Sequence, residues 1–155
     1  MKKKKTIAIV AHDNRKLDLM EWVEFNAHKL CKQKIVCTGT TGRMIEGRFK
    51  EVLDDDEFND LELTKLKSGP LGGDQQLGSL IVEGSIDMMI FFWDPMQPQP
   101  HDVDVKALLR ITVLYNIPTA CNRSTADFLI SSDLFHEEYF PRKDDYNDYI
   151  NRDVN

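Results

Sequence analysis

Short apolar segments and longer segments with helical periodicity alternate five times along this chain. The short segments are mostly apolar or β-branched and span 6–11, 34–37, 61–66, 86–93 and 117–121. After each one, apolar residues recur every three or four positions, which is typical of a helix. Successive strand–helix units of this kind place their strands parallel, with right-handed crossovers. The sequence therefore predicts an α/β fold, a doubly wound sandwich around a five-stranded parallel sheet.

The predicted helices follow polar or glycine-rich turns. We expect them over 15–30, 73–83, 103–115 and 122–130, with a further helix that carries Ile45, Phe49 and Val52 on one side. Segment 86–93 is the most apolar run and is predicted to be a central strand. Segment 54–60 is acidic and is predicted to be a surface loop. The tail from 141 onward is polar and aromatic, with helical character near 146–150.

Composition narrows the class of protein. With 155 residues, no repeats and no linker, the chain is expected to form one domain over 1–155. A net charge of −6 argues against a nucleic-acid partner, and the lysines at 2–5 are interpreted as a solvated start. No segment approaches the roughly 20 apolar residues of a membrane span, and no signal-peptide core follows the lysines. Three scattered cysteines without a C-x-x-C motif favour a reducing, cytoplasmic setting.

Every polar cluster of interest lies after a predicted strand and before a predicted helix. The clusters are 12–13, 38–42, 68–74, Asp94 and 122–125. In an open parallel sheet these connections lie along the carboxyl edge, where ligands bind. We therefore expect several of them to form one cleft.

Cluster 38–42, Thr-Gly-Thr-Thr-Gly, offers hydroxyl and amide groups at a helix start, which suits a phosphate. Ser68 and Gly69 are candidates for the same anion, and Lys16 is a candidate for its positive charge. Neither the Walker loop nor the G-x-G-x-x-G fingerprint is present. Ordinary helix capping by threonine stays open as the alternative.

The second half of the predicted site is acidic. Asp74 follows two glycines that expose it at a helix start, and Asp13, Asp94 and Asp104 lie at other strand or helix ends. Single aspartates at such positions are often helix caps, which remains an alternative for Asp104. A phosphate cradle, carboxylates and a histidine that titrates near neutral pH together predict acid–base chemistry on a small phosphorylated compound.

His12 and His101 both lie in loops at the same edge, where each is a site candidate or an ordinary surface histidine. Paired histidines and aspartates also fit a metal site, but no compact His-x-His or His-x₃-His spacing supports one. No metal and no organic cofactor are therefore predicted.

Over roughly 7–130 the chain resembles the methylglyoxal synthase family. The motifs that carry the resemblance are Ile-Ala-Ile-Val-Ala-His-Asp at 7–13, Thr-Gly-Thr-Thr-Gly at 38–42, Ser-Gly-Pro-Leu-Gly-Gly-Asp-Gln-Gln at 68–76, Phe-Phe-Trp-Asp-Pro at 91–95, the segment 101–110 and the segment 122–128. The resemblance implies a cofactor-free lyase that converts dihydroxyacetone phosphate to methylglyoxal and inorganic phosphate. It also implies a cytoplasmic homohexamer that inorganic phosphate inhibits.

The resemblance also implies residue roles. Asp74 matches the catalytic base and His101 the histidine that assists at the substrate oxygens. The positions that match the substrate and phosphate binders are His12, Lys16, Thr38, Gly39, Thr40, Thr41, Ser68 and Gly69. Asp13, Asp94 and Asp104 match supporting carboxylates. Arg152 stands near a family arginine that reaches the phosphate site of a neighbouring subunit.

The sequence does not decide the direction of the Asp74 pKa shift or the role of the acidic segment near 54–57. A helix N-terminus should lower the pKa of Asp74 and weaken it as a base, whereas a dry site should raise that pKa. The chain also departs from the family in the acidic insertion near 54–57, which is predicted to be a surface bulge. The alternative function is a non-catalytic, ligand-binding regulatory domain of the same fold.

Overall fold

A computed structural model describes residues 1–98, 100–142 and 144–152. Its centre is a five-stranded sheet in the order β3-β2-β1-β4-β5, and every strand pair is parallel. The strands are β1 (Thr6–Ala11), β2 (Lys34–Cys37), β3 (Glu62–Lys65), β4 (Met88–Phe92) and β5 (Thr119–Ala120). The predicted five-stranded parallel sheet is confirmed. Segment 86–93 supplies an interior strand, β4, although the middle position of the sheet belongs to β1.

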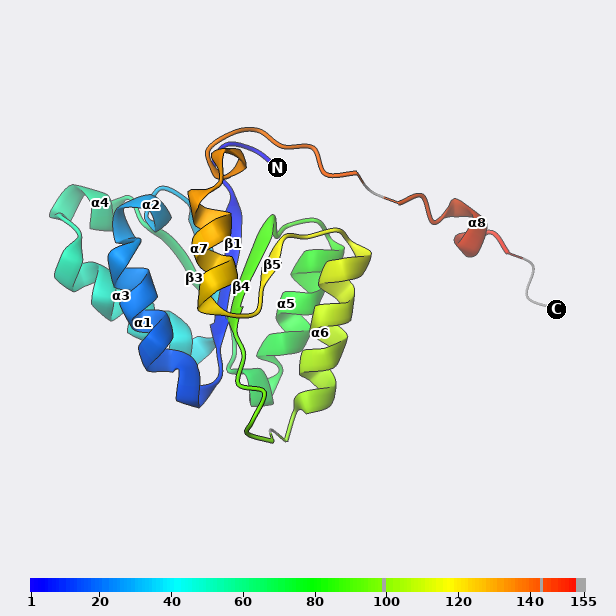
Figure 1. The fold of residues 1–155 in the computed structure, drawn as a ribbon, viewed down its shortest axis with the longest axis horizontal. Helices are drawn as coiled ribbons and strands as arrows, with labels where there is room; N and C mark the ends of the chain where they lie inside the picture. Colours follow the sequence, from blue (N-terminus) through cyan, green and yellow to red (C-terminus); the bar gives the residue numbers. More distant parts are fainter. Residues whose placement is uncertain (99, 143, 153–155) are drawn as a thin grey trace.

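The sheet is covered on both faces, as Figure 1 shows. Side chains of β1 alternate between the two apolar cores: Ile7 and Ile9 pack into one, Ala8 and Val10 into the other. Strands buried on both faces need near-continuous apolar sequence, which explains why β1 and β4 have few polar residues. The architecture is the predicted doubly wound sandwich.

Helices of one face are α1 (Lys16–Phe25), α2 (Ala27–Leu30), α3 (Gly39–Val52) and α7 (Arg123–Ser131). The other face is covered by α5 (Gly73–Val82) and α6 (Asp102–Leu114). The helix predicted over 15–30 is interrupted at Asn26, whose side-chain amide donates to the carbonyl of Trp22 over 2.9 Å. Short 3₁₀ turns η1 (Asp13–Arg15), η2 (Gly69–Leu71) and η3 (Asp133–Phe135) complete the connections.

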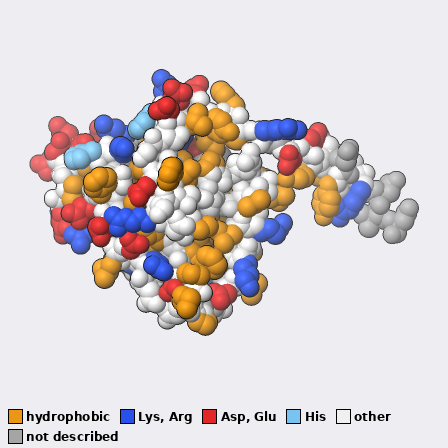
Figure 2. Space-filling view, viewed as in Figure 1, with side chains coloured by type: hydrophobic (Ala, Val, Ile, Leu, Met, Phe, Trp, Pro, Cys, Tyr) orange, Lys and Arg blue, Asp and Glu red, His pale blue; other side chains and the backbone are white. Residues whose placement is uncertain are grey.

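The acidic segment 54–60 is helical and not the predicted loop. It forms α4 (Asp55–Asn59), and the Asp54 carboxylate caps it by accepting the Glu57 amide proton over 2.8 Å. Acidic residues in a first helical turn are stabilised by the helix dipole, which offsets the low apolar content. Figure 2 shows acidic and basic side chains interspersed over the visible face.

The start of the chain meets the segment after η3 beside the amino ends of the strands. Met1 and Tyr139 exchange backbone hydrogen bonds of 2.7 and 3.1 Å, and the buried Lys5 ammonium donates to the Glu137 carbonyl over 2.8 Å. The tail then runs away from the helical layers to α8 (Asn147–Ile150), the helical character predicted for 146–150 (Figure 1). Among the described residues, no helix combines the length and apolar character that a membrane crossing requires.

Candidate active site

A cavity of about 200 Å³ opens at the carboxyl end of the central strand. Its walls come from the end of β1, the start of α3, η2, the first turn of α5, β4 and the residue before α6. The lining residues are Val10, Ala11, His12, Asp13, Lys16, Thr38, Thr40, Thr41, Ser68, Gly69, Pro70, Asp74, Phe91 and His101. Most of the side chains that the sequence singled out therefore share one cavity.

Asp74 points into this cavity from the first turn of α5. The two glycines that precede it are each required for a different reason. Gly72 has φ of +96°, in the left-handed region that glycine tolerates best. A Cβ on Gly73 would lie 2.1 Å from the Lys67 carbonyl oxygen, so only glycine permits this close backbone approach. The Asp74 side chain is buried as a result, and its Oδ2 atom has no hydrogen-bond partner among the described residues.

Burial decides the pKa of Asp74. Desolvation raises it above the ordinary aspartate value, and the nearby Asp104 carboxylate raises it further, while His101 and His12 oppose both. The question left open by the sequence, helix dipole against a dry site, is therefore answered in favour of the dry site. A raised pKa makes the Asp74 carboxylate a stronger base.

His101 faces Asp74 across a narrow gap. Its Nε2 atom lies 3.7 Å from Asp74 Oδ2, and its Nδ1 atom is buried without a partner in the part of the chain that the structure describes. A Cβ on Gly69 would lie 3.2 Å from both the Asp74 Oδ2 and the His101 Nε2 atoms, so a larger residue there would crowd the gap.

The orientation of His12 is fixed by the backbone. The Asp94 amide donates to His12 Nδ1 over 3.2 Å, and the ring packs edge-on against Phe91 at 5.1 Å between centroids. Because Nδ1 accepts this hydrogen bond, the neutral ring carries its hydrogen on Nε2, which is buried and has no partner within the described ranges. Burial, and next the neighbouring His101, lower the pKa of His12 and keep the ring neutral near pH 7.

The start of α3 offers groups that are able to bind an anion. Thr40 and Thr41 are the second and third residues of α3, where amide groups have no carbonyl partner within the helix. The Thr38 side chain makes no capping hydrogen bond to α3, so capping does not account for it. Lys16 pairs with Asp13 at the rim, and this ion pair lowers the pKa of Asp13.

Four candidate residues lie outside the cavity lining. The Gly39 amide donates to the Lys67 carbonyl over 3.2 Å, and Gly39 packs against the backbone of 66–68, just before η2. The Asp94 carboxylate accepts hydrogen bonds from the Met96 amide and the Asn14 side chain, and these bonds lower its pKa. Asp104 lines a shallow groove between α5 and α6 that also reaches Asp74. Arg152 stacks on the Tyr149 ring at 3.6 Å in the tail, away from the cavity (Figure 1).

Phe91 and Asn14 are the residues that sequence reasoning missed. Phe91 was assigned to the apolar strand, and nothing in an apolar run marks one ring as the support of a histidine. Asn14 stands directly after the His12-Asp13 pair, and that adjacency was the available signal. Among the described residues, no three His, Cys, Asp or Glu side chains are grouped as a metal ion would require.

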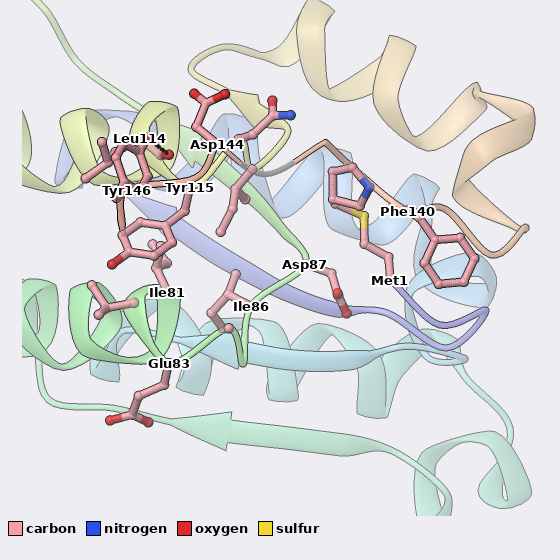
Figure 3. Close-up of a pocket in the computed structure, with 15 residues that line it drawn as sticks. Met1, Ile81, Glu83, Ile86, Asp87, Leu114, Tyr115, Phe140, Asp144 and Tyr146 are labelled. Atoms are coloured by element: carbon pink, nitrogen blue, oxygen red, sulfur yellow. Dashed lines mark hydrogen bonds between the residues drawn. The ribbon is translucent and has the colours of Figure 1, made fainter. Parts of the chain in front are cut away.

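A second, larger cavity of about 420 Å³ lies at the opposite end of the sheet, beside the amino end of β4 (Figure 3). Its wall includes Ile81, Ile86 and Tyr115. Two of its polar groups have hydrogen-bond partners: the Tyr146 hydroxyl donates to the Leu114 carbonyl over 3.0 Å, and Asp87 accepts a hydrogen bond from the Thr6 amide over 2.9 Å. Of the three buried, unpartnered side-chain polar atoms in the described residues, none lies in this cavity.

Fold and site together define a doubly wound α/β domain with a buried carboxylate, two histidines and an anion cradle at the carboxyl edge. Comparison with known proteins identifies the family within this class. The family model described as MGS-like domain matches residues 18–121. The chain belongs to the methylglyoxal synthase family.

Relatives match nearly the whole chain. The methylglyoxal synthase of Maridesulfovibrio salexigens is 55% identical over 155 residues, which cover 98% of this chain and 99% of the relative. The methylglyoxal synthase of Hahella chejuensis is 50% identical, with 96% of this chain and 90% of the relative covered. The crystal structure of methylglyoxal synthase from Elizabethkingia anophelis NUHP1 has a TM-score of 0.89 and 47% identity, and the match covers 100% of this chain and 95% of that one.

Proposed function

We propose that this protein is a lyase that converts dihydroxyacetone phosphate to methylglyoxal and inorganic phosphate, with Asp74 as the base. The observation that carries the residue assignment is the buried Asp74 carboxylate. Its Oδ2 atom lacks a partner among the described residues and lies opposite His101, in a cavity whose other wall is the start of α3. Membership of the methylglyoxal synthase family supports the reaction.

The first step is proton abstraction. Asp74 takes a proton from the hydroxymethyl carbon, and the electron pair of that C–H bond forms the double bond of an enediolate. Charge then develops on the former carbonyl oxygen and needs hydrogen-bond donors that are already in place. The Nε2–H group of His12 and the ring of His101 supply them, since both rings line the cavity.

The second step is elimination. The terminal hydroxyl gives its proton to the departing phosphate and becomes a carbonyl, the double bond shifts to join the central carbon and the phosphate-bearing carbon, and the C–O bond to phosphate breaks. The methylene carbon of the resulting enolate then takes the proton back from Asp74, which yields methylglyoxal and restores the carboxylate. Phosphate leaves into the cradle formed by Lys16, the α3 start and η2, where amide groups, hydroxyls and a cation stabilise its charge. The residues of this cradle are Lys16, Thr38, Thr40, Thr41, Ser68 and Gly69.

The experiment is product analysis with purified protein and dihydroxyacetone phosphate, without added metal. We expect equal amounts of phosphate and methylglyoxal. Glyceraldehyde phosphate as the product would indicate isomerisation and would contradict the proposal. Tight phosphate binding without turnover would instead support the regulatory-domain alternative.

We also propose that residues 1–155 act as one domain in a cytoplasmic homohexamer that inorganic phosphate inhibits. Phosphate is a product that fits the cradle, which supports inhibition at the same cavity. The tail carries Arg152 outward from its own subunit, which supports a contact with a neighbouring subunit (Figure 1). Light scattering after size-exclusion chromatography tests the hexamer, and initial rates at several phosphate concentrations test inhibition.

A further inference from the structure

The side chain of Asn14 connects two loops that are far apart in the sequence. It belongs to η1, directly after His12 and Asp13. Its Nδ2 atom donates to Asp94 Oδ2 over 3.0 Å and to Gln97 Oε1, both in the loop between β4 and α6. The partners are therefore 80 and 83 positions away in the chain. Asn14 does not cap η1, whose N-cap residue is His12.

Asp94 links the Asn14 side chain to the His12 ring, because its carboxylate bonds to Asn14 and its backbone amide bonds to His12. Its Oδ1 atom accepts the Met96 amide proton over 3.0 Å, which closes a tight turn, while Oδ2 is held by Asn14. The backbone amide of the same residue donates to His12 Nδ1 over 3.2 Å. A shift of the Asp94 turn would therefore move or release the bond that fixes which nitrogen of His12 carries the hydrogen.

The same loop ends at His101. Its ring lies 5.9 Å from the His12 ring, between centroids, and both line the cavity. One histidine thus precedes Asn14 in its own loop, and the other ends the loop that Asn14 holds. The Asn14 side chain bridges these two loops without itself lining the cavity.

We propose that Asn14 is a positioning residue that holds the two histidine-bearing loops in register and keeps His12 in the tautomer with hydrogen on Nε2. The inference rests on the proposed function for its effect on rate, but the tautomer itself is independent of any reaction. It gives the Asp94 carboxylate a role different from direct contact with substrate: Asp94 receives the Asn14 amide and presents its own backbone amide to His12.

The test exchanges the two partners. In N14D, a carboxylate faces the Asp94 carboxylate, so the donor is lost and the two groups repel. In the double variant N14D/D94N, the new amide at position 94 can donate to the new carboxylate at position 14, and its side-chain oxygen still accepts the Met96 amide proton. The Gln97 amide can rotate to donate to the same carboxylate. The matched control is N59D, the same chemical change on the exposed surface of α4.

Two measurements are made on the full-length protein. For kinetics, we expect N14D to lower kcat about 100-fold with KM changed less than about 3-fold, because misplacement of reacting groups affects the transition state more than binding. We expect the double variant to recover to within about 10-fold of the wild type, since the exchanged pair restores the tie. The imidazole ¹⁵N chemical shifts of His12 report directly which ring nitrogen carries the hydrogen. They should show Nε2–H in the wild type, in N59D and in the double variant, but a mixture in N14D.

The outcomes separate the two proposals. An N14D variant with wild-type kcat, or with an unchanged His12 spectrum, would overturn the positioning role. A double variant as inactive as N14D would do the same. If the wild type releases no phosphate from dihydroxyacetone phosphate, the proposed function fails, and the ¹⁵N spectra alone then decide whether Asn14 fixes the His12 tautomer.

Discussion

The two cavities at opposite ends of the sheet differ in chemistry more than in size. The one at the amino end has about 420 Å³ and the one at the carboxyl end about 200 Å³, yet the smaller contains all three buried, unpartnered side-chain polar atoms of the described residues. An unpaired buried polar group costs about 1–3 kcal/mol, so a fold retains several together only where something offsets the cost. Buried polar atoms that lack hydrogen-bond partners therefore identify the carboxyl-end cavity as the candidate active site, whereas cavity volume would favour the other one.

Helix direction sharpens the contrast. Because all strands are parallel, α3, α5 and α6 begin at the carboxyl end, where their N-termini favour an anion. At the other end α5 and α6 finish, and the described lining includes Glu83, Asp87 and Asp144 but no lysine or arginine side chain. Helix N-termini therefore favour an anion at the carboxyl end, whereas the described lining of the amino-end cavity carries acidic side chains beside the Met1 ammonium group.

The largest expected effect on kcat comes from neutralising one acidic side chain, when the same change is made in each cavity. We expect Asp74→Asn to lower kcat by about 10,000-fold, since an amide cannot accept the proton. Glu83→Gln at the amino-end cavity should leave kcat unchanged. Initial rates of phosphate release from dihydroxyacetone phosphate measure both. An active Asp74→Asn protein would eliminate Asp74 as the base.

Glycines of the two cavities give the next comparison. In Gly69→Ala the new methyl group would lie 3.2 Å from Asp74 Oδ2 and His101 Nε2, so we expect kcat to fall about 100-fold with little loss of stability. Gly84→Ala should instead lower stability without affecting kcat. With φ of +73° at Gly84, it should cost about 1 kcal/mol in the free energy of unfolding and leave kcat unchanged. Kinetics and urea unfolding of both variants test this; equal effects on kcat would remove the contrast.

The pH dependence of the rate gives a smaller effect. Burial raises the pKa of Asp74 above 3.8, so the base becomes protonated as pH falls through that higher value. We expect kcat to fall about tenfold per pH unit on this acidic limb, with a midpoint above 3.8. Glu83→Gln should not move the midpoint. A rate that stays constant down to the ordinary aspartate range would show that Asp74 is not the titrating group.

The smallest effects are on stability and should have opposite signs. Asp74→Asn removes a buried charge, so we expect it to raise the free energy of unfolding at pH 7 by about 1–2 kcal/mol. Tyr146→Phe removes the bond from the hydroxyl to the Leu114 carbonyl and should lower it by about 0.5–1 kcal/mol. The linkage supports the first sign: a folded-state pKa above the unfolded value makes ionised Asp74 unfavourable above that pKa. Denaturant titrations at pH 7 check both, and a destabilised Asp74→Asn protein would contradict the first.

Much of the fold could be predicted because its signals are local and repeated. The apolar runs and helical periodicity located all five strands and the helices that cover the sheet. Errors occurred where a contact or cap overrode composition: Asp54 starts α4 in a segment predicted to be a loop, and Asn26 interrupts the helix predicted over 15–30. Strand order was not predictable from apolarity, because β1 and β4 are buried on both faces alike.

The site was predictable in position more than in detail. Parallel topology brings the loops after successive strands together, so His12, the α3 start, Asp74 and His101 were expected at one edge, and the structure places them there. The sign of the Asp74 pKa shift depends on burial, which single-residue patterns do not encode. The engagement of Asp94 with Asn14 depends on a bond between residues 80 positions apart, which a sequence does not display.

The carbonyl oxygen of Lys67 contacts the starts of two helices at once. The Lys67 carbonyl accepts the Gly39 amide proton at the start of α3 and lies against Gly73 at the start of α5. It therefore sets the separation between the start of α3, the proposed phosphate wall, and the start of α5, which carries the proposed base. A carbonyl is present whatever side chain stands at position 67, so side-chain mutation there leaves this spacer in place. The spacing between the starts of α3 and α5 is thus insensitive to side-chain substitution at position 67, and its weak points are the two glycines that allow the contact, Gly39 and Gly73.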